Sequence, residues 1–323
     1  MDDGSTALNN RPRPRAILRE HRSAHKWSRQ PQHRRRRAGA SLVLVVLAVL
    51  VGVLLLVGGG GRASRLLPAG SNGLFSRIQT LAGGGAGSFA ATELAAENGA
   101  INRTLAYTPY VRIAGSQHRE VALTFDDGPG PYTPEVLSIL EQQNVPATFF
   151  EVGVLEQYFH ASTSEIVTRR YAVGDHTFSH APMSRLSRAD QRAQLLQDAL
   201  LLQRYGAAFP RLFRPPYGLW NSVTLALLHK YRMLMVLWTV DTSDYRRPGT
   251  AEIVKSAVAG AKPGAIILMH DAGGNRAETA AALPKVISQL RARGYRFVTV
   301  PRLLLDNPPP HNQQFSSLIG SGG

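Results

Sequence analysis

Six short apolar runs, separated by helical patterns, constrain the fold of this chain more than any other feature. The runs cover residues 120–125, 147–152, 211–213, 233–240, 264–269 and 295–300. We expect each run to be a strand, because short apolar stretches bounded by turn-forming residues are typical of buried strands. Strands that alternate with helices over about 180 residues predict an α/β fold with a parallel sheet, and we expect a distorted (β/α) barrel.

Start and stop signals mark the expected helices. Thr133, followed at once by a proline, is the expected N-cap of a helix. A long amphipathic stretch begins at Ser187 and can end at Gly206. Two further helices are expected after Gly249 and over residues 276–293.

The first part of the chain has a different composition. Residues 1–37 hold eleven Lys/Arg against three Asp/Glu and show no apolar periodicity, so we expect a disordered, Arg-rich cytoplasmic tail. The next twenty residues, from Ala38 to Val57, carry no charge and predict a transmembrane helix, since such a helix is about 30 Å long. The positive-inside rule then places everything after Arg62 outside a plasma membrane that the chain crosses once.

Two other interpretations of this region stay open. A nucleic-acid-binding tail would explain the arginines at 34–37, but the adjacent membrane span already accounts for them, and we expect no nucleic-acid partner. A cleaved signal peptide would explain the apolar run. However, the run is longer than a usual signal core, and no clear small-x-small cleavage site follows it.

The rest of the chain divides into three segments. Residues 58–110 are rich in Gly, Ala and Ser and predict a stalk that contains short helices. Residues 111–305 form the expected α/β domain, and residues 306–323 a disordered C-terminal tail. The chain has no cysteine, which excludes disulfides, thiolate metal ligands and a cysteine nucleophile.

Polar clusters follow the apolar runs, and in an α/β barrel such positions meet at the carboxyl ends of the strands. The first cluster is Asp126 with Asp127, followed by Gly-Pro-Gly. Adjacent carboxylates at a strand end repel each other unless a cation or a proton lies between them. A solvated Asp-Asp-Gly-Pro turn is the alternative for this stretch alone.

The second cluster contains His176 and His180, four residues apart. On a helical turn these two imidazoles would face the same way. Two imidazoles and one carboxylate make a three-ligand metal site with open positions, which catalytic zinc and non-haem iron both use. A structural or solvent-facing histidine pair is the alternative, but the carboxylate pair at another strand end favours a metal.

Two further clusters supply groups for acid–base chemistry. Arg214 precedes two prolines, so its guanidinium can brace a carboxylate, and a backbone N–H beyond the prolines can stabilise an oxyanion. His270 ends an apolar run, and a carboxylate within residues 239–245 can orient it and raise its pKa, as a general acid requires. The alternatives are a Pro-rich turn with a surface arginine and a core histidine.

The stretches TFDDGP, HTFSH, RPPYG and LMH, in this order, resemble those of the polysaccharide deacetylases. This family is carbohydrate esterase family four, which includes the nodulation-type chitooligosaccharide deacetylases. The resemblance covers roughly residues 118–305. It implies that residues 111–305 are the catalytic domain of a metal-dependent hydrolase that removes acetyl groups by attack of activated water.

Residue by residue, the resemblance implies a role for each cluster. Asp126 would be the general base, held by Arg214, and His270 the general acid, oriented by Asp244. The backbone amide of Tyr217 would bind the oxyanion. The ligands of a divalent metal ion, zinc or else cobalt or another such ion, would be Asp127, His176 and His180.

The chain departs from the family at two positions. The family usually has Trp where this chain has Tyr245, in the wall of the groove around the acetamide, so the change concerns the fit of the substrate. Asp175 stands where many relatives carry Asn, and we expect that change to be neutral.

The expected location narrows the substrate. An enzyme on the outer face of a plasma membrane meets peptidoglycan first, so we expect an N-acetylated envelope glycan. N-acetylglucosamine units of peptidoglycan are favoured over exported polysaccharide and chitooligosaccharide. The alternatives are an O-acetyl esterase acting on xylan or another glycan, a catalytically silent carbohydrate-binding protein, and a non-haem iron oxygenase. The sequence predicts no oligomeric state.

Overall fold

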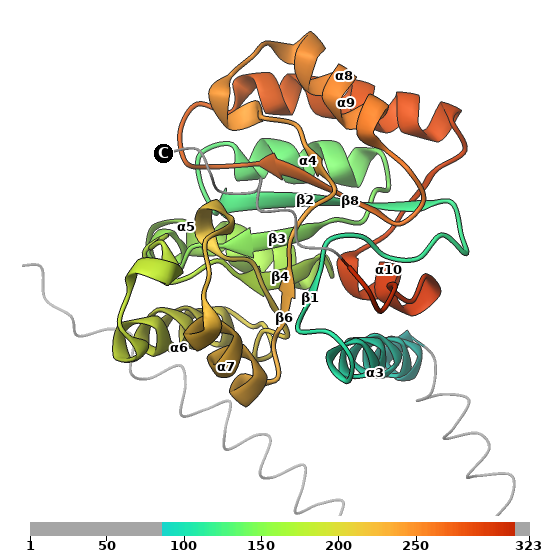
Figure 1. Ribbon diagram of the computed structural model, residues 1–323. Coiled ribbons are helices and arrows are strands. Elements are labelled where there is room, and N and C mark those ends of the chain that lie inside the picture. The colour runs from blue at the N-terminus through green and yellow to red at the C-terminus, as the bar shows by residue number, and fades with distance from the viewer. Residues whose placement is uncertain (1–85, 314–323) are drawn as a thin grey trace, which may run out of the picture. The chain divides into compact units, whose positions relative to one another are not determined.

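The apolar runs lie in one parallel sheet in the computed structural model, which describes residues 86–313 (Figure 1). The central strand β2 (Glu120–Gly128) pairs with β3 (Thr148–Glu151), β8 (Ala265–His270) and β9 (Arg296–Phe297). Beyond β3 follow β4 (Ala172–Asp175), β5 (Leu212–Phe213), β6 (Leu234–Val236) and β1 (Tyr110–Val111). Beyond β8 lies β7 (Val240–Asp241). The described strands thus form a curled half-barrel, an open form of the expected α/β barrel.

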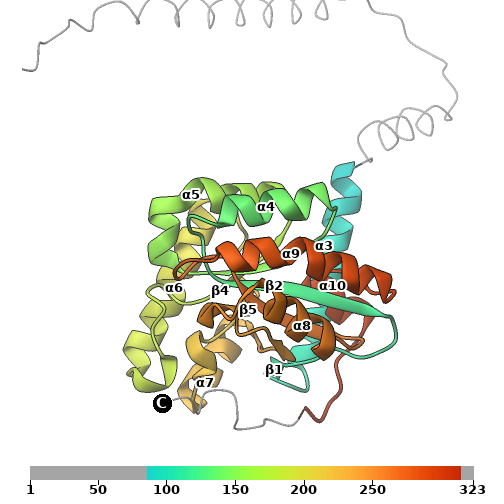
Figure 2. The ribbon, with the colours of Figure 1, turned by 90° about the horizontal axis from the view of Figure 1, so that it is seen from above.

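Two groups of helices cover this sheet, as two views show (Figures 1 and 2). The first group packs on β2 and β8 and consists of α4 (Thr133–Gln142), α8 (Thr250–Gly260) and α9 (Ala277–Ala292). The second covers β4 to β6 and consists of α5 (Gly153–Thr168), α6 (Arg188–Arg204) and α7 (Ser222–Tyr231). Short turns η1 (Met183–Arg185), η2 (Pro216–Gly218) and η3 (Asp244–Arg246) follow strand ends.

Burial of its side chains accounts for the central strand β2, and capping hydrogen bonds account for where helices begin. All but one residue of β2 is buried, as suits an apolar strand covered on both faces. The expected start of α6 is confirmed, because Oγ of Ser187 accepts a hydrogen bond from the N–H of Asp190 at 3.2 Å. Thr133 lies inside α4, whose N-cap is Tyr132, so its hydroxyl is available for another role.

The structure differs from the predicted strands at four places. β1 and β4 did not appear among the apolar runs. The run 233–240 divides into β6 and β7, and the run 295–300 is a strand only at its start. Its end begins α10 (Val300–Asp306), where Oγ1 of Thr299 accepts a hydrogen bond from the N–H of Arg302 and so caps the helix.

The folded part extends beyond both predicted domain boundaries. Helix α3 (Ala86–Leu105) falls in the predicted stalk, yet its buried Ile101 packs in a core cluster with α10. Asn307, in the predicted tail, is buried, and its side chain accepts from the N–H of His118 at 2.6 Å and donates to Glu120 at 2.8 Å. The assignment of residues 86–110 to a stalk and of 307–313 to a disordered tail was therefore wrong.

Several predicted segments lie outside the described residues. These are the cytoplasmic tail 1–37, the apolar run 38–57, the first part of the stalk and the last ten residues of the tail. Within residues 86–313, no helix combines the length and the hydropathy that crossing a bilayer requires.

Candidate active site

The polar clusters meet at the carboxyl ends of neighbouring strands, as predicted. Asp126 is the register partner of His270 between β2 and β8. Asp175, which precedes His176, is the register partner of Phe213, which precedes Arg214, between β4 and β5. Parallel pairing therefore brings side chains from four separate segments to one edge of the sheet.

The three predicted ligands lie close enough to share one metal ion. Oδ1 of Asp127 is 3.5 Å from Nε2 of His176 and 3.0 Å from Nε2 of His180. One ligand atom from each residue lies within 4.8 Å of the other two. The expected helical turn between the histidines was wrong, because the segment is irregular and has left-handed backbone at Thr177 (φ 71°) and His180 (φ 54°).

Hydrogen bonds at the far side of each ring turn the two histidines toward Asp127. Nδ1 of His176 donates to the carbonyl of Arg214 at 2.7 Å, which fixes the ring with Nε2 toward Asp127. Nδ1 of His180 lies 3.2 Å from Oη of Tyr217. Oδ1 of Asp127 is buried and faces the Nε2 atoms of both histidines. The donor set therefore fits a divalent cation with positions left open for water and substrate.

Electrostatics keep the ligand carboxylate ionised. Burial alone would raise the pKa of Asp127, but hydrogen bonds from His176 and His180 outweigh it and hold the pKa well below its usual range. Asp127 is therefore a carboxylate throughout the neutral range.

Asp126 is held beside this triad by a fully buried arginine. Nη1 of Arg214 donates to Oδ1 of Asp126 at 2.6 Å and to Oγ1 of Thr124 at 2.8 Å. Nε of Arg214 donates to the carbonyl of Val236 at 3.0 Å, and the guanidinium lies 4.1 Å from the ring centre of Phe150. Arg214 therefore fixes Oδ1 of Asp126. The other oxygen, Oδ2, faces the predicted metal ligands and lies 3.8 Å from Nε2 of His176.

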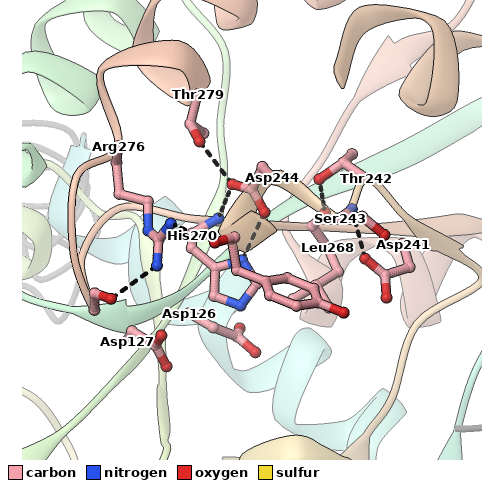
Figure 3. A network of polar contacts seen from close by, with 12 residues as sticks. Asp126, Asp127, Asp241, Thr242, Ser243, Asp244, Leu268, His270, Arg276 and Thr279 are labelled. Atoms are coloured by element: carbon pink, nitrogen blue, oxygen red, sulfur yellow. Dashed lines mark hydrogen bonds and ion pairs between the residues drawn. The ribbon is translucent and has the colours of Figure 1, made fainter. Parts of the chain in front are cut away.

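His270 and Asp244 form a second charged pair, and Asp126 and Asp127 both lie beside the His270 ring (Figure 3). Nδ1 of His270 donates to Oδ1 of Asp244 at 2.7 Å, and its backbone N–H donates to Oδ2 at 2.8 Å. Oγ1 of Thr279 also donates to Oδ2 at 2.8 Å. Burial disfavours both charges, but this pairing outweighs it and raises the pKa of His270 to about 9 while lowering that of Asp244. His270 is thus protonated at neutral pH.

Two tyrosines border the opening of this centre. Tyr217 is 59% exposed, its backbone is left-handed (φ 60°), and its N–H donates to no other described residue. Tyr245 is 40% exposed, and its ring centre lies 5.5 Å from that of His270 at an angle of 66°. The first can offer a free amide to an oxyanion, and the second forms a wall beside the imidazole.

Sequence reasoning missed a clamp beneath the Asp-Asp turn. Oγ1 of Thr133 donates to Oδ2 of Asp271 at 2.5 Å and accepts from the N–H of Gly130 at 2.7 Å. Asp271 is fully buried, and burial raises its pKa to about 7. A Cβ on Gly128 would lie 2.7 Å from both carboxylate oxygens of Asp271, so the turn needs glycine there. The position of Asp271, directly after His270, was the one available signal.

A group of buried acids behind the histidines was also missed. The group lies on β3, β4, α5 and α6 and consists of Glu151, Glu156, Asp175 and Asp198. Burial raises the pKa of each of these carboxyls, that of Glu151 to about 8. No ion pair joins any of the four to a Lys or Arg of the described chain. Burial and the absence of such a cation therefore both favour the protonated form of these carboxyls. Asp175, where many relatives carry Asn, thus belongs to this group of buried acids.

Comparison with known proteins agrees with this geometry. A family profile described as Polysaccharide deacetylase matches residues 114–236. A peptidoglycan-N-acetylglucosamine deacetylase of Bacillus cereus is 37% identical over 187 residues, which cover 57% of this chain and 87% of that protein. A chitooligosaccharide deacetylase of Bradyrhizobium is 37% identical over 202 residues, 57% of this chain and 90% of that protein.

Solved structures share the fold. The crystal structure of the Bc1960 peptidoglycan N-acetylglucosamine deacetylase matches with a TM-score of 0.59 and 32% identity, over 64% of this chain and 95% of that one. The BA3943 protein of Bacillus anthracis, described as a pseudoenzyme of carbohydrate esterase family four, matches with a TM-score of 0.57 and 29% identity, over 61% and 69% of the two chains.

Proposed function

This chain belongs to the polysaccharide deacetylase family, and from that premise we propose that it removes N-acetyl groups from N-acetylglucosamine units of an envelope glycan, with peptidoglycan favoured. The observation that carries the proposal is the placement of two charged pairs around one ligand triad. Asp126 with Arg214 and His270 with Asp244 both adjoin Asp127. A protein that only bound carbohydrate would need neither pair.

We propose a divalent metal ion, zinc or else cobalt or another such ion, on Asp127, His176 and His180. When bound there, such an ion lowers the pKa of water and polarises an acetamide carbonyl. The chain's own contribution is to present two imidazole ligands already oriented by hydrogen bonds, which reduces the reorganisation that binding would otherwise require.

The remaining groups divide the proton transfers between them. Asp126 accepts the proton of the attacking water, and Arg214 holds the carboxylate in place by donating to its Oδ1. The free N–H of Tyr217 donates to the oxygen that becomes negative. His270, protonated at neutral pH, gives its Nε2 proton to the leaving nitrogen, because an amide nitrogen does not leave as an anion. Acetate and a free amino sugar result.

A direct assay tests the activity. The full-length chain in detergent is incubated with purified peptidoglycan, with N-acetylglucosamine oligomers and with acetylated xylan, and released acetate is measured with and without a chelator. We expect chelator-sensitive acetate from the first two substrates, and more from peptidoglycan. Acetate from xylan alone would instead identify an O-acetyl esterase, and none from any substrate, with metal bound, would identify a silent carbohydrate-binding protein.

We also propose that residues 38–57 anchor the chain in the plasma membrane, with residues 1–37 in the cytoplasm and the catalytic domain outside. The support is the uncharged run of twenty residues and the arginines that precede it. Protease treatment of intact spheroplasts checks this topology, since it should degrade an epitope at the C-terminus and leave one at the N-terminus.

A further inference from the structure

Burial divides the charges of this domain unevenly. The buried charged residues include only two guanidinium groups, those of Arg214 and Arg276, against eight carboxylates. Those carboxylates are Glu120, Asp126, Glu151, Glu156, Asp175, Asp198, Asp244 and Asp271. The exposed surface is therefore richer in cations than the composition suggests, and a surface of this kind attracts anions.

One exposed cationic pair, Arg246 and Arg247, lies at the rim of the active site. Nε of Arg246 donates to Oη of Tyr245 at 3.1 Å, and its Cζ is 5.4 Å from the centre of that ring. The same ring lies 5.5 Å from the imidazole of His270. The guanidinium of Arg246 thus contacts the Tyr245 ring, and that ring in turn contacts the imidazole of His270.

The loop that carries the pair is fixed to the catalytic machinery. The backbone N–H of Arg247 donates to the carbonyl of Asp244 at 2.9 Å, and the carboxylate of Asp244 holds His270. Nη1 of Arg276 donates to the carbonyl of Tyr245 at 3.3 Å (Figure 3 shows Arg276 beside this network). A loop already held in place loses little conformational entropy when a ligand binds.

The positive charge of this loop has no carboxylate partner. No ion pair joins Arg246, Arg247 or Arg276 to an acid within residues 86–313. Asp241 is the exposed acid of the same loop, and its Oδ1 accepts the N–H of Ser243 at 2.7 Å. The carboxylates of Asp241, Asp244 and Glu278 in this region already accept hydrogen bonds from backbone N–H groups, and none of them forms an ion pair with the exposed arginines.

We propose that Arg246 and Arg247 bind a carboxylate of the glycan on the unit next to the one that is deacetylated. This inference rests on the proposed deacetylase function and gives its substrate class: a glycan with acidic substituents rather than a neutral oligosaccharide. The guanidinium fork matches a carboxylate with two parallel hydrogen bonds, and Tyr245 supports the side of Arg246 that faces the active site.

Kinetics on matched substrates test the proposal. The substrates are a tetrasaccharide of alternating N-acetylglucosamine and N-acetylmuramic acid with free lactyl carboxylates, the same compound with those groups converted to methyl amides, and neutral N-acetylglucosamine tetramer. The proteins are the full-length wild type, R246Q/R247Q, and K285Q as the control. Lys285 is exposed on α9, so the control removes surface charge away from the loop.

We expect R246Q/R247Q to raise KM for the carboxylate substrate by about three- to twentyfold, the range for two lost exposed ion pairs. The kcat for that substrate and both constants for the neutral substrates should stay within about twofold, since the pair does not touch the reacting atoms. Added salt should remove the wild type's preference for the carboxylate substrate and leave the variant unchanged.

Each outcome separates the two proposals. Equal wild-type kcat/KM on the carboxylate substrate and its amide, with acetate released from both, overturns the role of the arginines and keeps the deacetylase. An equal KM increase in K285Q also overturns it, because general surface charge would then account for the preference. Failure of the wild type to release acetate from any of the three overturns the function on which the inference rests.

Discussion

Asp244 holds His270 at two points, through Nδ1 of the ring at 2.7 Å and through the backbone N–H at 2.8 Å. Each oxygen of the carboxylate takes one of these bonds, so the ring is fixed in tautomer and in direction. Nε2 is the only nitrogen left to face the substrate. The pairing also sets the charge of the ring, and therefore the pH range of the reaction.

The alkaline limit of activity should follow the pKa of His270. That pKa is raised to about 9, so the ring is protonated and active below this pH, and kcat/KM should fall as the pH rises through it. Asp244→Asn removes the ion pair and should move the limit down by about two pH units. pH–rate profiles on N-acetylglucosamine tetramer measure both.

Thr279→Val is the graded control for that shift. It removes only the hydrogen bond from Oγ1 of Thr279 to Asp244 and should move the limit in the same direction by less than Asp244→Asn does. Identical alkaline limits in all three proteins would show that His270 does not supply the proton.

The ligands and the base should separate in a metal-binding assay. Asp127→Ala and His180→Ala should lose both bound metal and activity, because each removes one of three ligands. Asp126→Asn should keep the metal and lose rate by about 10²–10⁴, the usual contribution of a general base. Elemental analysis beside acetate release makes the comparison, and a fully active Asp126→Asn would contradict the assignment.

The Arg214–Asp126 pair should matter to stability as well as to rate. Arg214→Met leaves Asp126 buried without its cation, which should lower the free energy of unfolding by about 3–5 kcal/mol. Urea unfolding measures this loss. The double variant Asp126→Asn with Arg214→Met should recover part of it, and a fully additive loss would mean that the two side chains act independently.

The buried acids should make the domain less stable as the pH rises. Burial raises the pKa of Glu151, Glu156 and Asp198 in the folded state, so the folded protein binds more protons than the unfolded chain. Stability is then full below the unfolded pKa near 4 and is lost as the pH rises toward the folded values, about 8 for Glu151.

Neutral isosteres test this pH dependence. Asp198→Asn and Glu156→Gln should raise Tm at pH 8 by about 2–4 °C for each kcal/mol of relieved cost, and should change it less at pH 5. Glu135→Gln, on the exposed face of α4, should show no such pH dependence. Equal effects at both pH values would show that these carboxyls are ionised in the folded protein.

The sequence predicted the site best where a charged or titratable residue directly follows an apolar run. Asp126, Arg214 and His270 all follow apolar runs, and parallel pairing placed them together. Both imidazoles of the HTFSH segment lie beside Asp127, but not through the helical turn that was expected, because a left-handed backbone, which no helical spacing predicts, turns the two rings.

What the sequence did not reveal depends on contacts between distant segments. The Thr133–Asp271 bond joins residues 138 positions apart, and neither residue type marks such a bond by itself. β4 is four residues long and includes a glycine, so its apolar signal is weak. The folded boundaries were missed because Asn307 is a polar residue in a Pro-rich stretch, and only its buried partners show that it belongs to the domain.

Arg214 joins the two halves of the site through one residue: its carbonyl positions His176 and its guanidinium positions Asp126. In the proposed function, metal affinity and proton transfer are consequently coupled at this strand end, and a library of variants there would change both together. His180 is different, since within residues 86–313 its far nitrogen has the hydroxyl of exposed Tyr217 as its hydrogen-bond partner. Substitution of the Tyr217 side chain should therefore change the surroundings of His180 without moving Asp126, which Arg214 holds.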